Sequence, residues 1–238
     1  MTDLSPPGSS EQIIDSKVMS DGTEFVLVKE GEHWIVRVAG RALMSSHVTD
    51  SEEALADHTL DRLDDPEDIL IGGLGLGFTL RAVLDQVSAQ TRVTVAELVP
   101  SLVGWNHSYV GGLNDHPLDD ERCEVVIGNV METIRASASR FDAIILDVDN
   151  GPVALSNTDN DQIYSVAGVR ACHRALRPHG ILAVWSAGPS PKFERTLSSA
   201  HFDTEVIRVA AREGTAARHV LFIARRLSST GGKKRKRR

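Results

Sequence analysis

Residues 68–77 read DILIGGLGLG, an apolar run that leads into a loop with glycine at every second position. The run has the length and composition of a buried strand, and residues 78–87 continue with the spacing of a helix. Glycine lets the backbone turn sharply and approach a ligand closely. A strand, a glycine loop and a helix in this order predict a ligand-binding turn that uses Gly73, Gly75 and Gly77. A tight turn without a ligand is the alternative.

The alternation of strand and helix continues after this loop. Four further apolar runs of strand length are separated by helical stretches, at residues 92–96, 124–127, 141–146 and 181–185. Such strands between helices predict a parallel sheet that is covered on both faces. The last two runs, 205–209 and 220–224, are too close together for a crossover helix, so they predict an antiparallel hairpin. The expected fold class is α/β, with a Rossmann-like, mostly parallel sheet and an antiparallel last strand.

The residues before the glycine loop follow another pattern. Strand-like runs at 24–29 and 34–38 flank a predicted turn, and a third short strand near 41–44 precedes an acid-rich helix start at Asp50. The chain is therefore divided into four parts: an unstructured N-terminus at 1–15, a small β-hairpin and helix element at 16–63, the Rossmann-like domain at 64–227 and an unstructured basic tail at 228–238.

Polar side chains follow the ends of several predicted strands. Glu97 ends the second strand, 20 residues after Gly77, where an acid is placed to accept both ribose hydroxyls. Asn129 follows the third strand and is placed to bond an adenine edge, or else it is a turn residue. These strand ends, together with the glycine loop, predict an adenosyl ligand. The Gly-x-Gly-x-Gly spacing disfavours a nicotinamide dinucleotide, whose sites prefer Gly-x-Gly-x-x-Gly.

Two carboxylates follow the central fourth strand, at Asp147 and Asp149. Carboxylates this close repel each other, which raises the pKa of one of them. They predict a site that holds a cationic substrate or takes a proton from an attacking amine. A helix or turn cap is the alternative. The polar loop that follows, at 151–162, is either a lid over this site or a passive surface loop.

On these residues the chain resembles the spermidine synthase family, roughly over residues 24–226. The matching stretches are 71–77, 97, 125–129, 141–147 and 177–182, together with the small β-rich N-terminal element. The resemblance implies the class I methyltransferase fold, decarboxylated S-adenosylmethionine as co-substrate, and transfer of its aminopropyl group to an amine such as putrescine. Many members of the family form dimers, so a homodimer is a candidate assembly. It implies that Glu97 holds the ribose and that Asn129 and Asp147 face the adenosyl ligand. By the same resemblance, Asp149 stands near the catalytic aspartate.

The chain departs from the family where an amine is recognised. The family's glycine loop usually carries an aspartate that contacts the ligand's amine, whereas Leu74 and Leu76 interrupt the loop here. The family usually has Asp at the position of Asn129, and its catalytic segment is one residue longer than 147–149. Its N-terminal helix usually carries a Gln and a Tyr-x-Glu pattern, which residues 44–59 lack. The candidates for their place are His47, Glu52, Asp57 and His58.

The leading hypothesis is a transferase that acts on an S-adenosyl sulfonium, either S-adenosylmethionine or its decarboxylated form. Aminopropyl transfer to a small amine acceptor is favoured, because Asp147 and Asp149 suit a cationic amine. Methyl transfer to a small molecule is a close second, because the loop has lost its amine-binding acid. A non-catalytic protein that binds an adenosyl metabolite is a third hypothesis, and a nicotinamide-dependent oxidoreductase is a fourth.

Charge and composition limit the partners. The net charge is −7, but the last six residues, Lys233 to Arg238, are all basic; without them 20 basic residues stand against 33 acidic ones, which gives −13. An acidic body disfavours nucleic acid, so the tail is the candidate for such a contact. Cys123 and Cys172 lie in ordinary segments and predict neither a disulfide framework nor a metal site. With no membrane-length apolar run and no signal-peptide pattern, the cytoplasm is the expected location.

Overall fold

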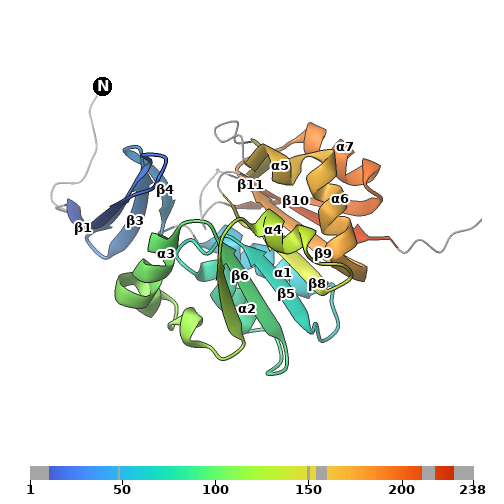
Figure 1. Cartoon of the computed structure of the whole chain (residues 1–238), viewed down its shortest axis with the longest axis horizontal. Coiled ribbons are helices and arrows are strands. Elements are labelled where there is room, and N and C mark those ends of the chain that lie inside the picture. The colour runs from blue at the N-terminus through green and yellow to red at the C-terminus, as the bar shows by residue number, and fades with distance from the viewer. Residues whose placement is uncertain (1–10, 48, 149–150, 154–159, 211–217, 228–238) are drawn as a thin grey trace, which may run out of the picture.

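The structure is a computed structural model of the chain, and it describes residues 11–47, 49–148, 151–153, 160–210 and 218–227. Asp149, the loop centre at 154–159 and the basic tail at 228–238 lie outside this part of the chain, so the expectations for them stay predictions. Figure 1 shows a small sheet beside a larger body, in which helices flank a second sheet.

The larger sheet has seven strands in the order β10-β11-β9-β8-β5-β6-β7. Their bounds are β5 (Asp68–Gly72), β6 (Arg92–Glu97), β7 (Cys123–Ile127), β8 (Phe141–Leu146), β9 (Leu176–Ser186), β10 (Phe202–Ala210) and β11 (Arg218–Arg226). Neighbouring strands from β9 to β7 pair in parallel, whereas β11 pairs antiparallel with both β9 and β10. The predicted α/β class and the antiparallel last strand are therefore confirmed. Strand order reverses between β5 and β8, and ligands of open α/β sheets bind at such a point.

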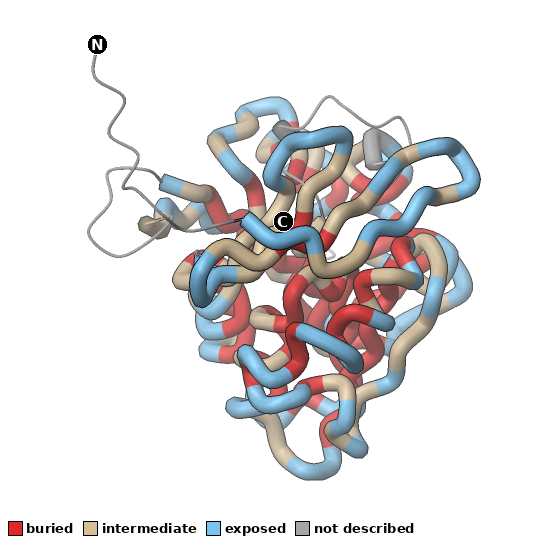
Figure 2. The backbone as a smooth tube through the Cα atoms, turned by 90° about the vertical axis from the view of Figure 1, so that its left-hand side faces the viewer, coloured by how far each residue is buried: buried red, intermediate tan, exposed pale blue. Residues whose placement is uncertain are grey.

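Helices cover both faces of this sheet. Successive residues of a strand point to opposite faces, so an apolar strand presents side chains that need cover on both. The α-helices are α1 (Asp50–Leu60), α2 (Phe78–Leu84), α3 (Pro100–Trp105), α4 (Val130–Arg135), α5 (Asn160–Tyr164), α6 (Val166–Ala175) and α7 (Pro191–Ser199), with shorter turns at Asn106–Val110, Gly111–Leu113, Pro117–Asp119 and Gly151–Val153. Leu70 and Ile144 pack under α4, α6 and α7, and Ile71 and Ile145 pack under α1 and α2. Buried segments gather in the interior and exposed ones at the outer turns (Figure 2).

None of the helices in the described part of the chain has the length and hydropathy that crossing a membrane requires.

The small sheet is antiparallel throughout and has the order β1-β2-β3-β4. Its strands are β1 (Glu11–Val18), β2 (Glu24–Glu30), β3 (His33–Val38) and β4 (Arg41–Ser45). The prediction that residues 1–15 are unstructured is wrong from Glu11 onward, because β1 begins there and pairs with β2. The strand is mostly exposed at the edge of its sheet. Backbone pairing rather than burial defines it, and a strand of this kind has only a weak hydrophobic pattern.

The position of α1 corrects a second expectation. The helix was grouped with the small β element, in a unit that ended at residue 63. In the structure Leu55 and Ala56 of α1 are fully buried in the core on the α2 side of the larger sheet. The change of packing partner therefore falls before Asp50, and α1 belongs with the sheet that carries the glycine loop.

A third apolar core joins the two sheets. Leu27 and Val36 of the small sheet meet Leu76 of the glycine loop and Leu102 and Trp105 of α3. The Trp105 indole also donates a 2.9 Å hydrogen bond to the carboxylate of Asp15 in β1. The glycine loop is thus held between the two sheets, with apolar contacts on both sides.

Candidate active site

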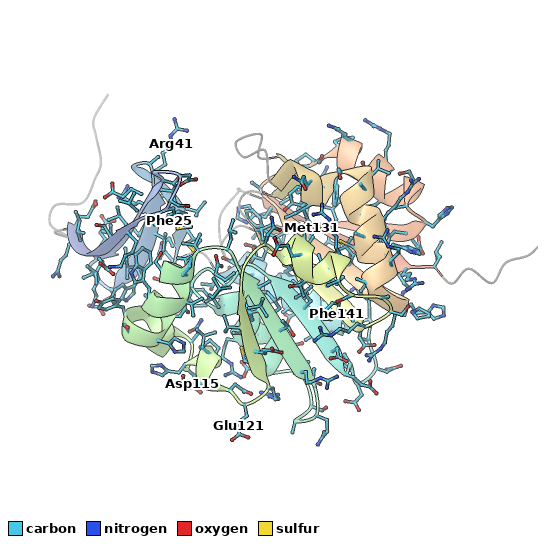
Figure 3. All side chains as sticks on the ribbon, in the orientation of Figure 1. Phe25, Arg41, Asp115, Glu121, Met131 and Phe141 are labelled. Carbon is cyan, nitrogen blue, oxygen red and sulfur yellow. The ribbon has the colours of Figure 1, made fainter. Side chains whose placement is uncertain are left out.

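A cavity of about 440 Å³ lies at the carboxyl ends of β5, β6 and β8, beside the strand-order reversal. Its walls come from the glycine loop, from the start of α1, and from β2 and β4 of the small sheet; Phe25, which is labelled in Figure 3, reaches it from β2. The polar side chains that line it are Ser45, Ser51, Glu52, Thr79, Glu97, Asn129, Asp147 and His219. Larger apolar surfaces come from Met44, Phe78, Leu98 and Trp185.

Gly73 and Gly75 line the cavity, as predicted for a ligand-binding turn. Gly73 has a φ of +89°, and a Cβ there would collide with the main-chain oxygen of Asp147. Glycine at this position therefore lets the loop lie directly against the end of β8. Gly77 also has a φ of +89°, but it is the N-cap of α2 and does not line the cavity. A Cβ there would lie 2.9 Å from the Asn114 amide nitrogen.

The two leucines that interrupt the loop are structural anchors. Leu74 and Leu76 are each only 5% exposed. Leu74 packs into the core on the α1 and α2 face, and Leu76 packs into the core that includes the small sheet. Burying each of these side chains contributes about 1.5–3 kcal/mol relative to exposure. The apolar residues thus fix the shape of a loop whose glycines alone would leave it flexible.

Glu97 lies at the end of β6, buried, with its carboxylate held by two main-chain donors. The N–H of Leu74 donates to Oε2 and the N–H of Val99 donates to Oε1, each at 2.7 Å. The first of these bonds ties the acid directly to the glycine loop. Because a carboxylate oxygen accepts more than one hydrogen bond, this arrangement also suits the two neighbouring hydroxyls of a ribose.

Asn129 lines the cavity but also caps α4. Its Oδ1 accepts a 2.9 Å hydrogen bond from the N–H of Met131, which is the turn role considered as its alternative. With the oxygen used in this way, the side-chain NH₂ is the group suited to a ligand acceptor. Leu98, which is 51% exposed, lies in the same wall and offers an apolar surface for a flat ring.

Asp147 follows β8 and lines the cavity behind the glycine loop. Thr79, in the first turn of α2, donates a 2.7 Å hydrogen bond from its hydroxyl to Oδ2 of Asp147. Burial raises the pKa of Asp147, and the hydroxyl bond opposes this shift in part. A cation in the cavity would favour the ionised carboxylate, so the site is suited to a positively charged group.

Glu52 is the member of the four N-terminal candidates that reaches the cavity. Burial, and then repulsion by Asp147, raises its pKa from an ordinary value of 4.5 to about 8. The Ser51 hydroxyl donates to Oε2 of Glu52 at 3.1 Å and lies 3.0 Å from Nδ1 of His219. The other three candidates, His47, Asp57 and His58, do not line the cavity.

Several lining residues were missed by the sequence reasoning. Trp185 is the next-to-last residue of β9 and lies at the same edge as Asp147, so its place near the end of an apolar run was a usable signal. His219 lies near the start of β11, and because β11 is antiparallel its start reaches the edge where the other strands end. Met44 comes from the small sheet, and nothing in its sequence context points to the cavity.

The charge of the cavity wall has one sign. Glu52, Glu97 and Asp147 supply three carboxyl groups, and none of the described residues that line the cavity is Lys or Arg. The half-buried carboxyl groups of Glu52 and Asp147 favour a ligand that brings positive charge. The wall therefore combines a buried carboxylate at Glu97, an apolar surface at Leu98 and an acidic end at Glu52 and Asp147.

Comparisons with known proteins show which family the chain resembles. The family model described as spermine/spermidine synthase domain matches residues 49–208. Polyamine aminopropyltransferase 2 of Pseudomonas aeruginosa is 32% identical over 125 residues, which cover 51% of this chain and 34% of that protein. Polyamine aminopropyltransferase of Sulfolobus acidocaldarius is 28% identical over 138 residues, covering 58% of this chain and 44% of that protein. The chain thus spans less than half the length of these two curated relatives.

Solved structures of spermidine synthases have the same fold. One is the crystal structure of spermidine synthase in complex with the transition state analogue AdoDATO, with a TM-score of 0.75 and 22% identity over 90% of this chain and 73% of that chain. Another is spermidine synthase from Thermotoga maritima, with a TM-score of 0.71 and 21% identity over 90% and 72% of the two chains. The predicted class I methyltransferase-like architecture with a small N-terminal β element is confirmed by this likeness.

Proposed function

The chain belongs to the spermine/spermidine synthase family, and we propose on this premise that it transfers an aminopropyl group from decarboxylated S-adenosylmethionine to an amine. The observation that carries the proposal is the cavity wall, which offers the Glu97 carboxylate to a ribose at one side and the half-buried carboxyl groups of Glu52 and Asp147 to a cation at the other. The donor carries an adenosine, a sulfonium and an ammonium. Glu97 and Leu98 suit the adenosine, and the carboxyl groups of Glu52 and Asp147 suit the positive charges of the sulfonium and the ammonium.

Each lining residue then has a role in the proposed reaction. Glu97, oriented by two main-chain N–H groups, accepts hydrogen bonds from the ribose hydroxyls. Asn129 and Leu98 face the adenine, the first through its side-chain NH₂ and the second through apolar contact. Asp147 stabilises positive charge on the donor or the acceptor. Asp149, which lies outside the described residues, remains our prediction for the group that orients the acceptor amine.

The chemistry needs alignment more than activation. The amine nitrogen attacks the propyl carbon next to sulfur, a C–N bond forms, the C–S bond breaks, and its electron pair stays on sulfur. The sulfonium becomes the neutral thioether 5′-methylthioadenosine, and the amine loses one proton to a carboxylate. Because the sulfonium is already a good leaving group, the cavity contributes mainly by holding the two reactants in line and excluding water.

The direct test is product analysis. Purified protein is incubated with decarboxylated S-adenosylmethionine and one of several diamines, and the mixture is analysed by mass spectrometry. We expect 5′-methylthioadenosine together with an amine that is longer by one aminopropyl unit. Calorimetry should show tighter binding of decarboxylated S-adenosylmethionine than of S-adenosylmethionine. Tighter binding of the carboxylated form, without aminopropyl product, would overturn the proposal.

Methyl transfer is the second candidate, and one observation favours it. The glycine loop carries no acid, and beside Gly75 the space for a side chain is limited by the Met44 sulfur, which lies 3.3 Å from an added Cβ. The loop therefore offers no carboxylate that could bind the amine of the decarboxylated donor at this position. A methyltransferase would convert S-adenosylmethionine to S-adenosylhomocysteine, so the same mass spectra distinguish the two reactions.

A further inference from the structure

Glu52, Asp147, Ser51 and His219 meet at one end of the cavity from three separate elements. Glu52 and Ser51 come from the first turn of α1, Asp147 follows β8, and His219 lies on β11. Ser51 lies between Glu52 and His219, with its hydroxyl 3.1 Å from the Glu52 carboxylate and 3.0 Å from the histidine ring nitrogen. Thr79 of α2 holds the other carboxylate. Both acids, which we call the acid pair, are therefore fixed at the wall by neighbouring hydroxyls.

The surroundings of the acid pair favour a cation. Among the described residues, the charged groups that act on Glu52 are Asp147 and Glu53, and both are acidic. Burial lowers the pKa of His219, which favours its neutral form. The indole ring of Trp185 lines the same cavity and packs edge-on to His219, with 4.6 Å between ring centroids. Indole faces attract ammonium groups. The Nε1 of Trp185 is also buried and has no acceptor among the described residues. A ligand or a water molecule in the cavity would supply one.

We propose that Glu52 and Asp147 together bind a primary ammonium group, which makes Glu52 a specificity-determining residue of the transfer reaction. An ammonium has three N–H donors and a full positive charge, so it can bond both carboxylates at once. The inference rests on the proposed function for the identity of the ligand. The ammonium is either that of the donor's aminopropyl chain or that of the acceptor amine, and both have the same chemistry.

If Glu52 and Asp147 bind an ammonium group, the number of protons released on binding can be measured. In the free protein near pH 7 the acid pair holds a proton, because Glu52 ionises only with a pKa of about 8. A bound ammonium stabilises both carboxylates in their ionised form, so the proton leaves. Binding should therefore release most of one proton per ligand near pH 7, and almost none near about pH 9, where Glu52 is already ionised.

The experiment is titration calorimetry in two buffers of different ionisation enthalpy, which reports the protons released on binding. Three probes are used: decarboxylated S-adenosylmethionine, 5′-methylthioadenosine, and a diamine added to the 5′-methylthioadenosine complex. Wild-type protein is compared with Glu52→Gln. Glu53→Gln is the matched control, because Glu53 is the adjacent acid of α1 but is exposed and does not line the cavity.

We expect proton release with a probe that carries an ammonium and none with 5′-methylthioadenosine alone. Glu52→Gln should abolish the release and weaken binding of the ammonium probe by about 10- to 100-fold, the range for a hydrogen bond to a charged group. It should leave 5′-methylthioadenosine affinity unchanged. Glu53→Gln should keep the proton release with only a small change, because Glu53 is the weakest of the causes that raise the pKa of Glu52. Release with the decarboxylated donor assigns the pair to the aminopropyl ammonium, and release only with the diamine assigns it to the acceptor.

Two results separate this inference from the proposed function. If Glu52→Gln bound each probe with wild-type affinity and wild-type proton release, the role of Glu52 would be overturned while aminopropyl transfer by the wild-type protein could still stand. If the wild-type protein released protons on binding the donor, and Glu52→Gln did not, but no aminopropyl product formed, then Glu52 would keep its role and the proposed reaction would be wrong.

Discussion

Glu52 carries an acidic side chain in a setting that favours its protonated form. Its pKa of about 8 in the folded chain lies well above the ordinary value of 4.5. Between these values the folded chain holds a proton that the unfolded chain has already lost. The free energy of unfolding therefore falls as the pH rises, by about 1.4 kcal/mol per pH unit for one such group.

We expect Glu52→Gln to remove this slope, because glutamine has no proton to lose. Urea unfolding of the variant and the wild type at several pH values checks this. The stability of the variant relative to wild type should rise by about 1.4 kcal/mol per pH unit between about pH 5.5 and about pH 7.5. Glu53→Gln, the exposed neighbour, controls for the loss of a charge on α1. A difference between Glu52→Gln and wild type that stays constant with pH would contradict the expectation.

Asp147 offers a second test at the residue scale. Asp147→Asn keeps the shape of the side chain and can still accept the hydrogen bond from Thr79, but it removes the negative charge. We expect kcat/KM for aminopropyl transfer to fall by about 100-fold or more, with 5′-methylthioadenosine binding retained. Asp57→Asn is the control, since Asp57 is an exposed acid of α1 that bonds Gln86 outside the cavity. Wild-type kcat/KM in Asp147→Asn would rule out a role for its charge.

The residues of the site differ in how far the sequence predicts them. Glu97, Asn129 and Asp147 follow apolar runs, and the carboxyl ends of parallel strands meet at one edge, so their convergence on one cavity could be predicted. Glu52 was only one of four candidates, because the face that a helix buries depends on the sheet it packs against. Met44 could not be predicted, because its place depends on how the small sheet sits against the glycine loop.

Among the elements, the glycine loop is the most constrained by its neighbours. Gly73→Ala would put a side chain at a φ of +89° and against the main-chain oxygen of Asp147. We expect a loss of at least about 2 kcal/mol in the free energy of unfolding and loss of nucleoside binding, measured by urea unfolding and calorimetry.

A matched glycine gives the control for that change. Gly104 lies within α3, has no strained φ, and has open space where a Cβ would be. Gly104→Ala should therefore be neutral or stabilise the protein by up to about 1 kcal/mol. Equal effects of the two substitutions would show that the loop geometry is not responsible for the loss.

The elements also show where sequence patterns fail. The central strands of the larger sheet are predictable because they are apolar runs buried on both faces, as β5 and β8 illustrate. The strand β1 was not, since its side chains are mostly exposed and its pairing depends on backbone groups that no side-chain pattern records. The partner of α1 was missed for a related reason: proximity in sequence to the small sheet did not determine where its apolar face packs.

At the scale of the whole molecule, the core shared by the two sheets has a consequence for unfolding. Leu76 of the glycine loop packs with residues of the small sheet and of α3, so neither sheet can separate without exposing this core. The chain has three tryptophans, and the structure places Trp34 on the small sheet, Trp105 on α3 and Trp185 on the larger sheet. Each of them reports on a different part of the molecule.

We expect the two sheets to unfold in one transition. Variants that keep a single tryptophan, with the other two changed to phenylalanine, are unfolded in urea and followed by fluorescence, with circular dichroism as the second probe. The three midpoints should coincide once each is compared with the circular dichroism midpoint of the same variant. A fluorescence change of Trp34 at clearly lower urea than the circular dichroism transition would show that the small sheet unfolds independently.

The place of β11 between β9 and β10 also sets an order of assembly during synthesis. The ribosome makes β9 and β10 before β11, yet neither of these strands pairs with the other in the finished sheet. Until residues 218–226 leave the exit tunnel, the edge of β9 has no partner from this part of the sheet and is open to pairing with other chains. The same strand carries His219 to the cavity. When β11 pairs with β9, the nascent chain therefore covers the open edge of β9 and completes the His219 side of its cavity in the same late step.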